Sequence, residues 1–199
     1  MATSVVSICN MALGMLGNAN TIESLNELSV QARTMGQWYD TARREALSAH
    51  DWSFARSRQD LALHEEDPPE GLWGFRYQVP ATMLKALRLR GPRVPEYPKV
   101  PFELETSADG ETVTLLTDLP EAALIFTRDS TQVSLYPPGF VLLLARTLAA
   151  YTSPVITGNT QVTAFQFQQL ERELRRAAGR DANQQGPVEP PDSDMITER

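Results

Sequence analysis

The chain has 199 residues, 42% of them hydrophobic, and a formal net charge of −7. This length predicts one domain, or one domain with an appendage, that buries a sizeable core without disulfides or a structural metal. The acidic balance argues against an extensive sheath of phosphate contacts, although it allows a surface that DNA slides past without sticking. The lone Cys9 lies in a helical apolar pattern, so we expect a reduced core residue rather than a nucleophile.

Residues 1–17 predict a helix rather than a secretory leader, because they lack a cationic start and a small-residue cleavage site. Thr3 or Ser4 can cap this helix, and Gly17 marks its C-terminal stop. The Asn-, Ser- and Thr-rich loop that follows carries three apolar residues that we expect to be anchors, namely Ile22, Leu25 and Leu28.

A second helix is expected from Ser29 to about His50. Its outer face should carry Arg33, Asp40, Arg43, Arg44 and Glu45. These cations could touch phosphate, but in an acidic chain a solvated face or an intersubunit surface is favoured. Beyond it, Trp52 and Phe54 should lock the helix end onto the core. His50 and Asp51 are neighbours and point in different directions, so they form no acid–base pair.

The middle of the chain is harder to interpret, and residues 56–63 suit a strand and a helix equally. In the loop 64–71, the carboxylates beside His64 have neither the spacing nor the second cluster that a metal site or a glycosidase pair requires. Trp73, Phe75 and Tyr77 alternate at period two, which favours packing in the core over stacking on bases.

A short helix is expected from Pro80 through Met83, Leu84 and Leu87. Residues 90–101 carry four prolines and should form an extended cationic loop. Three short strands, at 102–105, 112–117 and 122–128, are joined by the Asp109-Gly110 turn and by residues 118–121. They predict an antiparallel meander at about 102–128. Such a small sheet needs a helix to lie against, and the central helix and its neighbours are the expected partners.

The stretch 136–151 contains the run Phe140-Val141-Leu142-Leu143-Leu144-Ala145, with no polar face. Its proline pair at the start and Ser153-Pro154 at the end favour a helix over a buried strand. It is shorter than a membrane span and is interrupted by Arg146 and Thr147, so helices of this chain or of neighbouring copies must cover it.

A last helix is expected at about 161–178, with an apolar stripe formed by Val162, Phe167, Leu170, Leu174 and Ala178. From Asp181 onward polar residues and prolines dominate, and five carboxylates against Arg199 give this tail a net charge of −4. The tail should be disordered in isolation, either as an inert terminus or as a segment that orders on a partner.

These elements predict an α+β protein, mainly α. Residues 1–180 should form a helical bundle around a buried central helix with the small β-meander, and 181–199 a disordered acidic tail.

The order of the motifs resembles that of bacteriophage head-to-tail adaptors of the tail tubular protein A type, over about residues 5 to 176. The segments that carry the likeness are Leu13-Gly14-Met15-Leu16-Gly17, Ile22-Glu23-Ser24-Leu25, Arg43-Arg44-Glu45, Trp52-Ser53-Phe54-Ala55, Tyr77-Gln78-Val79-Pro80, Leu124-Ile125-Phe126-Thr127-Arg128 and the helix from Ala145 to Tyr151. The loop 90–101 and the tail match no pattern of the family.

The resemblance implies a virion structural protein with no catalytic role, no cofactor, no metal and no membrane contact. Such adaptors assemble in the host cytoplasm as a dodecameric ring beneath the portal protein, extend the channel through which DNA passes, and present the surface on which the tail nozzle is built. An acidic channel wall that repels DNA would suit the net charge. Two alternatives remain open: another neck protein such as a stopper, and a tail-associated peptidoglycan hydrolase acting through Glu65 or Glu66.

The resemblance also suggests contact residues. The C-terminal segment commonly runs against the portal, which implies portal contacts by Arg180, Asp181, Gln184, Gln185, Pro187, Val188, Pro190, Met195 and Ile196. The expected intersubunit residues are Arg43, Arg44, Glu45, Glu171, Arg175 and Arg176. Deleting residues 179–199 is expected to leave the domain folded but unable to bind portal rings.

Overall fold

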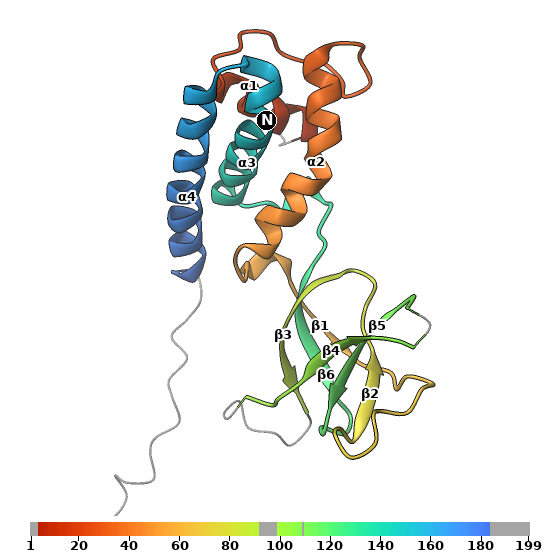
Figure 1. The fold of residues 1–199 in the computed structure, drawn as a ribbon. Helices are drawn as coiled ribbons and strands as arrows, with labels where there is room; N and C mark the ends of the chain where they lie inside the picture. Colours follow the sequence, from red (N-terminus) through yellow and green to blue (C-terminus); the bar gives the residue numbers. More distant parts are fainter. Residues whose placement is uncertain (1–3, 92–98, 109, 184–199) are drawn as a thin grey trace, which may run out of the picture.

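The computed structural model describes residues 4–91, 99–108 and 110–183. Over these residues the chain is an α+β protein, with helices at one end and strands at the other (Figure 1). The helices are α1 (Val5–Met15), α2 (Val30–Ser48), α3 (Pro138–Thr157) and α4 (Thr160–Ala182), with 3-10 turns η1 (Ser53–Ala55) and η2 (Val133–Leu135). The strands are β1 (Arg56–Asp60), β2 (Phe75–Gln78), β3 (Met83–Arg90), β4 (Glu103–Thr106), β5 (Val113–Thr117) and β6 (Ala123–Arg128).

The helix starts follow from local capping chemistry. Ser4 accepts a hydrogen bond from the Ser7 amide in a capping box, and Ser29 accepts one from the Ala32 amide. Gly17, the predicted stop of the first helix, has a φ of 74°. This left-handed conformation costs glycine little and other residues more, so the expected end of α1 is confirmed.

Helix α3 is the apolar stretch predicted to be helical, and it packs on α1, α2 and α4. It runs through the exposed Pro154 to Thr157, so Pro154 is not the stop we expected. At 20 residues α3 is long and apolar enough to cross a membrane, and the expectation that it is too short was wrong. In the described structure, 61% of the most apolar 18-residue segment of α3 is buried, as in the core helix of a globular protein.

An aromatic cluster joins the end of α2 to the start of α3, as predicted for Trp52 and Phe54. Their ring centroids lie 5.3 and 4.9 Å from that of Phe140. The Trp52 indole Nε1–H donates to the Ala46 carbonyl at 2.8 Å, so this buried side chain has no unsatisfied donor.

The strands form two antiparallel sheets, of order β1-β6-β3 and β2-β5-β4. Strands β4 and β5 pair as expected, but β6 pairs with β1 and β3, so the predicted three-stranded meander is wrong. The sheets pack on each other around Tyr77, Leu115, Leu124 and Phe126. The expectation that they lie against the central helix is therefore also wrong, because each sheet supplies the other's apolar cover.

The segment from Met83 is strand β3, not the expected short helix. Its apolar residues suited either state, and pairing with β6 decided between them. Leu89 pairs with Leu124 on the core side, while Arg88 pairs with Ile125 on the other side. The ambiguous segment 56–63 begins with the strand β1 and pairs with the opposite edge of β6.

Cys9 is fully buried, as predicted, and burial raises the pKa of its thiol to about 12. The thiolate, which is the reactive form, is therefore scarce at neutral pH. We expect no modification of the folded protein by a thiol-specific disulfide reagent at about pH 8, and complete modification in guanidinium chloride. Rapid labelling without denaturant would contradict this prediction.

Candidate functional site

The C-terminal end of α4 is fixed by the buried carboxylate of Asp181. This carboxylate accepts hydrogen bonds from the Ser53 amide at 3.1 and 3.2 Å and from the Ser53 hydroxyl at 2.6 Å. The turn η1 begins at Ser53, and its own N-cap residue makes no side-chain capping bond. Asp181 thus acts as the missing cap from a distant helix and ties α4 to the end of α2.

His50 completes this cluster, since its Nε2 lies 3.3 Å from Asp181 Oδ2. A Ser–His–Asp set of this composition invites comparison with a nucleophilic triad, which requires the histidine between the hydroxyl and the carboxylate. Here the Ser53 hydroxyl donates directly to Asp181, and the His50 ring lies edge-on to Trp52 at 4.8 Å. The arrangement clamps the chain and does not activate the serine.

These contacts correct the expected boundary of the tail. Asp181 is only 5% exposed and belongs to α4, so it is part of the fold and not of the tail, while its assignment as a portal contact stays a prediction. Arg180 also lies in α4, but its side chain is 59% exposed and 3.7 Å from Glu173. The other residues assigned to the portal contact, Gln184, Gln185, Pro187, Val188, Pro190, Met195 and Ile196, lie outside the described residues.

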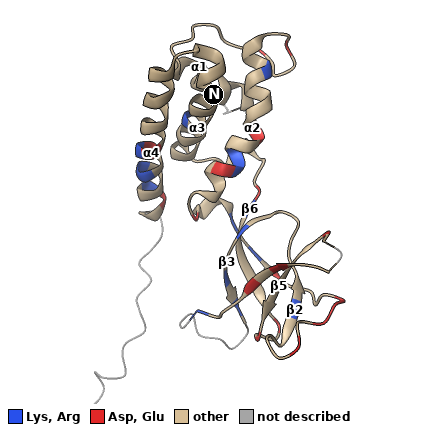
Figure 2. Cartoon of the chain, in the orientation of Figure 1, with Lys and Arg blue, Asp and Glu red and all other residues tan. Residues whose placement is uncertain are grey.

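A charged joint connects the helical end to the strands, and Figure 2 shows basic and acidic positions beside each other on α2. Arg43 is buried and binds Asp129, the Ser130 carbonyl at 3.1 Å and Asp40 at 3.4 Å. Burial opposes the charge of Arg43, but the hydrogen bond and charge of Asp129 outweigh it and leave its pKa raised. Arg43 therefore does not lie on the outer face of α2 as we expected, while its intersubunit role stays a prediction.

The other intersubunit candidates are exposed. Arg44 has a 61% exposed side chain that pairs with Asp129 at 3.2 Å, and Glu45 lies beside it. On α4, Glu171 and Arg175 form an i,i+4 ion pair at 3.5 Å, and Arg176 is exposed. These positions can meet another molecule.

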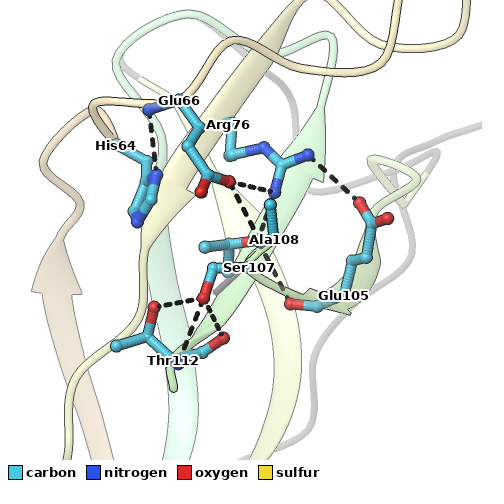
Figure 3. Close-up of polar contacts among 8 residues, drawn as sticks. His64, Glu66, Arg76, Glu105, Ser107, Ala108 and Thr112 are labelled. Atoms are coloured by element: carbon cyan, nitrogen blue, oxygen red, sulfur yellow. Dashed lines mark hydrogen bonds and ion pairs between the residues drawn. The ribbon is translucent and has the colours of Figure 1, made fainter. Parts of the chain in front are cut away.

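A second polar cluster lies in the sheet β2-β5-β4, around the buried guanidinium of Arg76 (Figure 3). Its nitrogens lie 3.3 Å from Glu66 and 3.3 Å from Glu105, and 3.3 Å from the Thr114 hydroxyl. The His64 ring accepts the Glu66 amide hydrogen. Arg76 thus joins the loop that carries Glu66 to strand β4 through two ion pairs.

Exposed apolar residues occur at the start of α2 and around α4, the two helices that Figure 1 places on opposite sides of the helical end. On the α2 side, Leu28 is 94% exposed and Val30 is 57% exposed. On the α4 side the exposed residues are Val155, Phe165 and Phe167, with exposed fractions of 60%, 53% and 43%. Phe165 and Phe167 project from different sides of α4, and the Phe167 ring lies beside that of Tyr151, with centroids 6.1 Å apart. We call Leu28 and Val30 the α2 surface, and Val155 and Phe165 the α4 surface.

The sequence offered signals for both surfaces that our interpretation missed. Leu28 was expected to be an anchor, which is wrong. Leu28 precedes the N-cap Ser29, and a residue at this position packs on the helix when the fourth helical residue is apolar. Here the fourth helical residue is Arg33, so Leu28 has no apolar partner of that kind. Phe165 and Phe167 are two positions apart in a helix, so they cannot both face the core.

A pocket of about 360 Å³ lies beside the α4 surface, lined by Pro154, Gly158, Asn159, Thr160, Thr163 and Ala164. Another, of about 390 Å³, lies between Trp52, Phe140 and the end of α4. The described residues contain no cluster of three or more His, Cys, Asp or Glu side chains that could hold a metal ion. Neither pocket combines a nucleophile with a positioned base.

Comparison with protein-family models and with curated proteins gives no match.

Proposed function

We propose that the protein is a virion structural subunit, a head-to-tail adaptor that forms a ring below the portal protein, extends the DNA channel and provides the attachment surface for the tail nozzle. The observation that carries this proposal is the pair of different apolar surfaces on opposite sides of one subunit. A head-to-tail contact between unlike surfaces closes into a ring when the rotation between subunits permits, whereas a two-fold dimer uses one surface twice.

The two surfaces are suited to each other. Leu28 projects from the α2 surface, and the pocket of about 360 Å³ beside the α4 surface is the concave feature that would receive it from the next copy. Exposed apolar residues of this size cost solubility in a solitary chain, so their cover by a neighbouring copy is favourable. In this proposal the four helices form one bundle around α3, and the bundle is the repeating unit of a dodecameric ring. Arg44, Glu45, Glu171, Arg175 and Arg176 form its polar rim.

The C-terminal segment is the proposed portal contact. The Asp181 clamp holds the C-terminal end of α4 near Asn183, the last described residue, and in this proposal residues 184–199 bind an equivalent site on each portal subunit. Because Asp181 binds Ser53, the deletion of residues 179–199 that the sequence suggested would also disturb the fold. A truncation that ends the chain at Asn183 keeps this contact.

A chain truncated after Asn183 is expected to keep its thermal unfolding midpoint and to lose binding to purified portal rings in a sedimentation assay. The full chain is the reference, and a second variant with the four carboxylates at Glu189, Asp192, Asp194 and Glu198 replaced by amides tests the charge of the segment alone. Full co-sedimentation of the truncated chain would show that the portal contact lies elsewhere. Electron cryomicroscopy of the particle would distinguish an adaptor from a stopper by its position along the tail axis.

A further inference from the structure

The pocket of about 390 Å³ between the start of α3 and the end of α4 has apolar walls. Trp52, Phe140 and Ala177 line it, and none of the three is more than 2% exposed. Gly139 leaves part of the wall without a side chain, and a Cβ added there would meet only the Arg180 side chain, at 3.8 Å. The volume lies in the range of ligand pockets, about 300–1,000 Å³. We call this the helix-end pocket.

A row of arginines on α4 ends at the helix-end pocket. Arg172, Arg176 and Arg180 are exposed and recur every four residues, so they are neighbours on one side of the helix. Arg180 lines the pocket and lies 3.7 Å from Glu173, whereas Arg172 and Arg176 form no ion pair with any residue that the structure describes. Figure 2 shows basic positions together in the C-terminal half of α4. An apolar pocket beside this row suits an apolar side chain carried by an acidic segment.

The chain itself supplies such a segment beside the pocket. Helix α4 is capped by Asn183, two residues after Asp181, which lines the pocket. Residues 184–199 lie outside the described residues and follow directly. Their first apolar residue after the proline is Val188, and four carboxylates come after it, namely Glu189, Asp192, Asp194 and Glu198. Five residues of chain span up to about 17 Å, and two residues of helix about 3 Å, so Val188 can reach back to the pocket of its own chain.

We propose that Val188 occupies the helix-end pocket of its own chain and that the carboxylates after it lie along the arginine row. The connection favours this over the same contact between two copies. A contact of one side chain and a few exposed charges is weak, with a Kd of about 1 mM, whereas a short tether gives an effective concentration of millimolar order. The dipeptide Gly186-Pro187 directly before Val188 is typical of a turn, which this return of the chain requires.

The contact competes with any other partner of the same segment. While Val188 is docked it is withheld from the portal protein, so the apparent affinity for portal is the intrinsic affinity multiplied by the undocked fraction. This consequence rests on the proposed adaptor function, but the docking itself does not. A docked fraction of about two thirds stabilises the folded chain by only about 0.6 kcal/mol, so the truncation after Asn183 still unfolds close to the midpoint of the full chain.

The test measures the reactivity of Val188→Cys in the full chain with a thiol-specific disulfide reagent. Cys9 is fully buried and should add no signal. A peptide of residues 184–199 with the same substitution gives the rate of the undocked thiol. The full chain should react about threefold more slowly than the peptide, since only the undocked fraction reacts. The rate constant should be the same at low and at high protein concentration.

Gly139→Leu fills the helix-end pocket from α3, where leucine suits a helix better than glycine. In the Val188→Cys chain it should raise the reaction rate to that of the peptide. Ala164→Leu is the matched control, because it places the same side chain in the separate pocket of about 360 Å³ and should leave the reaction slow. Arg172→Gln/Arg176→Gln should raise the rate in part, as should high salt, because both weaken the attraction of the carboxylates.

Reaction of the full chain at the rate of the peptide would overturn the proposal, as would protection that Gly139→Leu leaves unchanged. Protection that appears only at high protein concentration would also overturn it, because the contact would then join two copies. Portal binding is measured separately with Val188 intact, and Gly139→Leu should bind portal rings about threefold more tightly than the unmodified chain. Portal binding without docking would end this inference and leave the adaptor function intact, and docking without portal binding would do the reverse.

Discussion

Val30→Asp and Phe165→Asp are each expected to abolish ring formation, whereas an equimolar mixture of the two variants should stop at a complex of two chains. Each substitution places a carboxylate in one apolar surface and leaves the other surface intact. Burying a charge without a partner costs several kcal/mol, and we expect this cost to exceed the binding free energy of a single contact between two subunits. The mixture offers one sound contact, between the α2 surface of Phe165→Asp and the α4 surface of Val30→Asp, and no second one to continue the ring.

Native mass spectrometry counts the chains in each assembly, with portal rings added where the chain needs them to assemble. Both altered side chains are more than half exposed, so the subunit itself should unfold at its usual temperature. Leu72→Asp supplies the matched control, because Leu72 is 71% exposed on the strand region and outside both surfaces. Full rings from either single variant would refute the head-to-tail contact, as would full rings from the mixture.

Asp181→Ala is expected to lower the free energy of unfolding by about 3 kcal/mol. Hydrogen bonds to charged groups contribute about 1.5–3 kcal/mol each, and a donor left without a partner adds to the loss. Asp181 is 5% exposed and accepts hydrogen bonds from both the amide and the hydroxyl of Ser53. Because the site is buried, water replaces the lost carboxylate oxygens poorly as an acceptor for these two donors. Urea unfolding followed by circular dichroism measures the change.

Ser53→Ala removes only the hydroxyl from this clamp and should cost about 1 kcal/mol. The double variant should lose less than the sum of the two single losses, because both side chains belong to one contact. A loss below 1 kcal/mol for Asp181→Ala would mean that the end of α4 is held by packing alone. In that case the departure point of residues 184–199 would no longer be set by the clamp.

The helices were the most predictable part of the fold, because their signals are local. Ser4, Ser29 and Gly17 act where the sequence placed them, and the apolar run of α3 required burial whatever its neighbours were. The pairing of the strands was harder to predict from the sequence. Nothing local distinguishes a third meander strand from a strand that crosses to another sheet, and the Met83 segment carries apolar residues compatible with both helix and strand.

The sequence correctly placed Glu171 and Arg175 on the surface of a helix, but it did not reveal the burial of Arg43 and Asp181. Glu171 with Arg175 follows from i,i+4 spacing, which one helix determines alone. Arg43 and Asp181 are buried because of partners 86 and 128 residues away, Asp129 and Ser53.

The pairing of Arg56 with Thr127 means that the chain leaves and re-enters the helical region at almost the same point, since paired residues of antiparallel strands lie about 5 Å apart. The six strands of the described residues therefore all belong to one insert between α2 and α3, which joins the helices at a single point. Such an insert can be lengthened, shortened or exchanged for another without rethreading the helices. Selection could thus alter what the strands contact while leaving the packing of the helices unchanged.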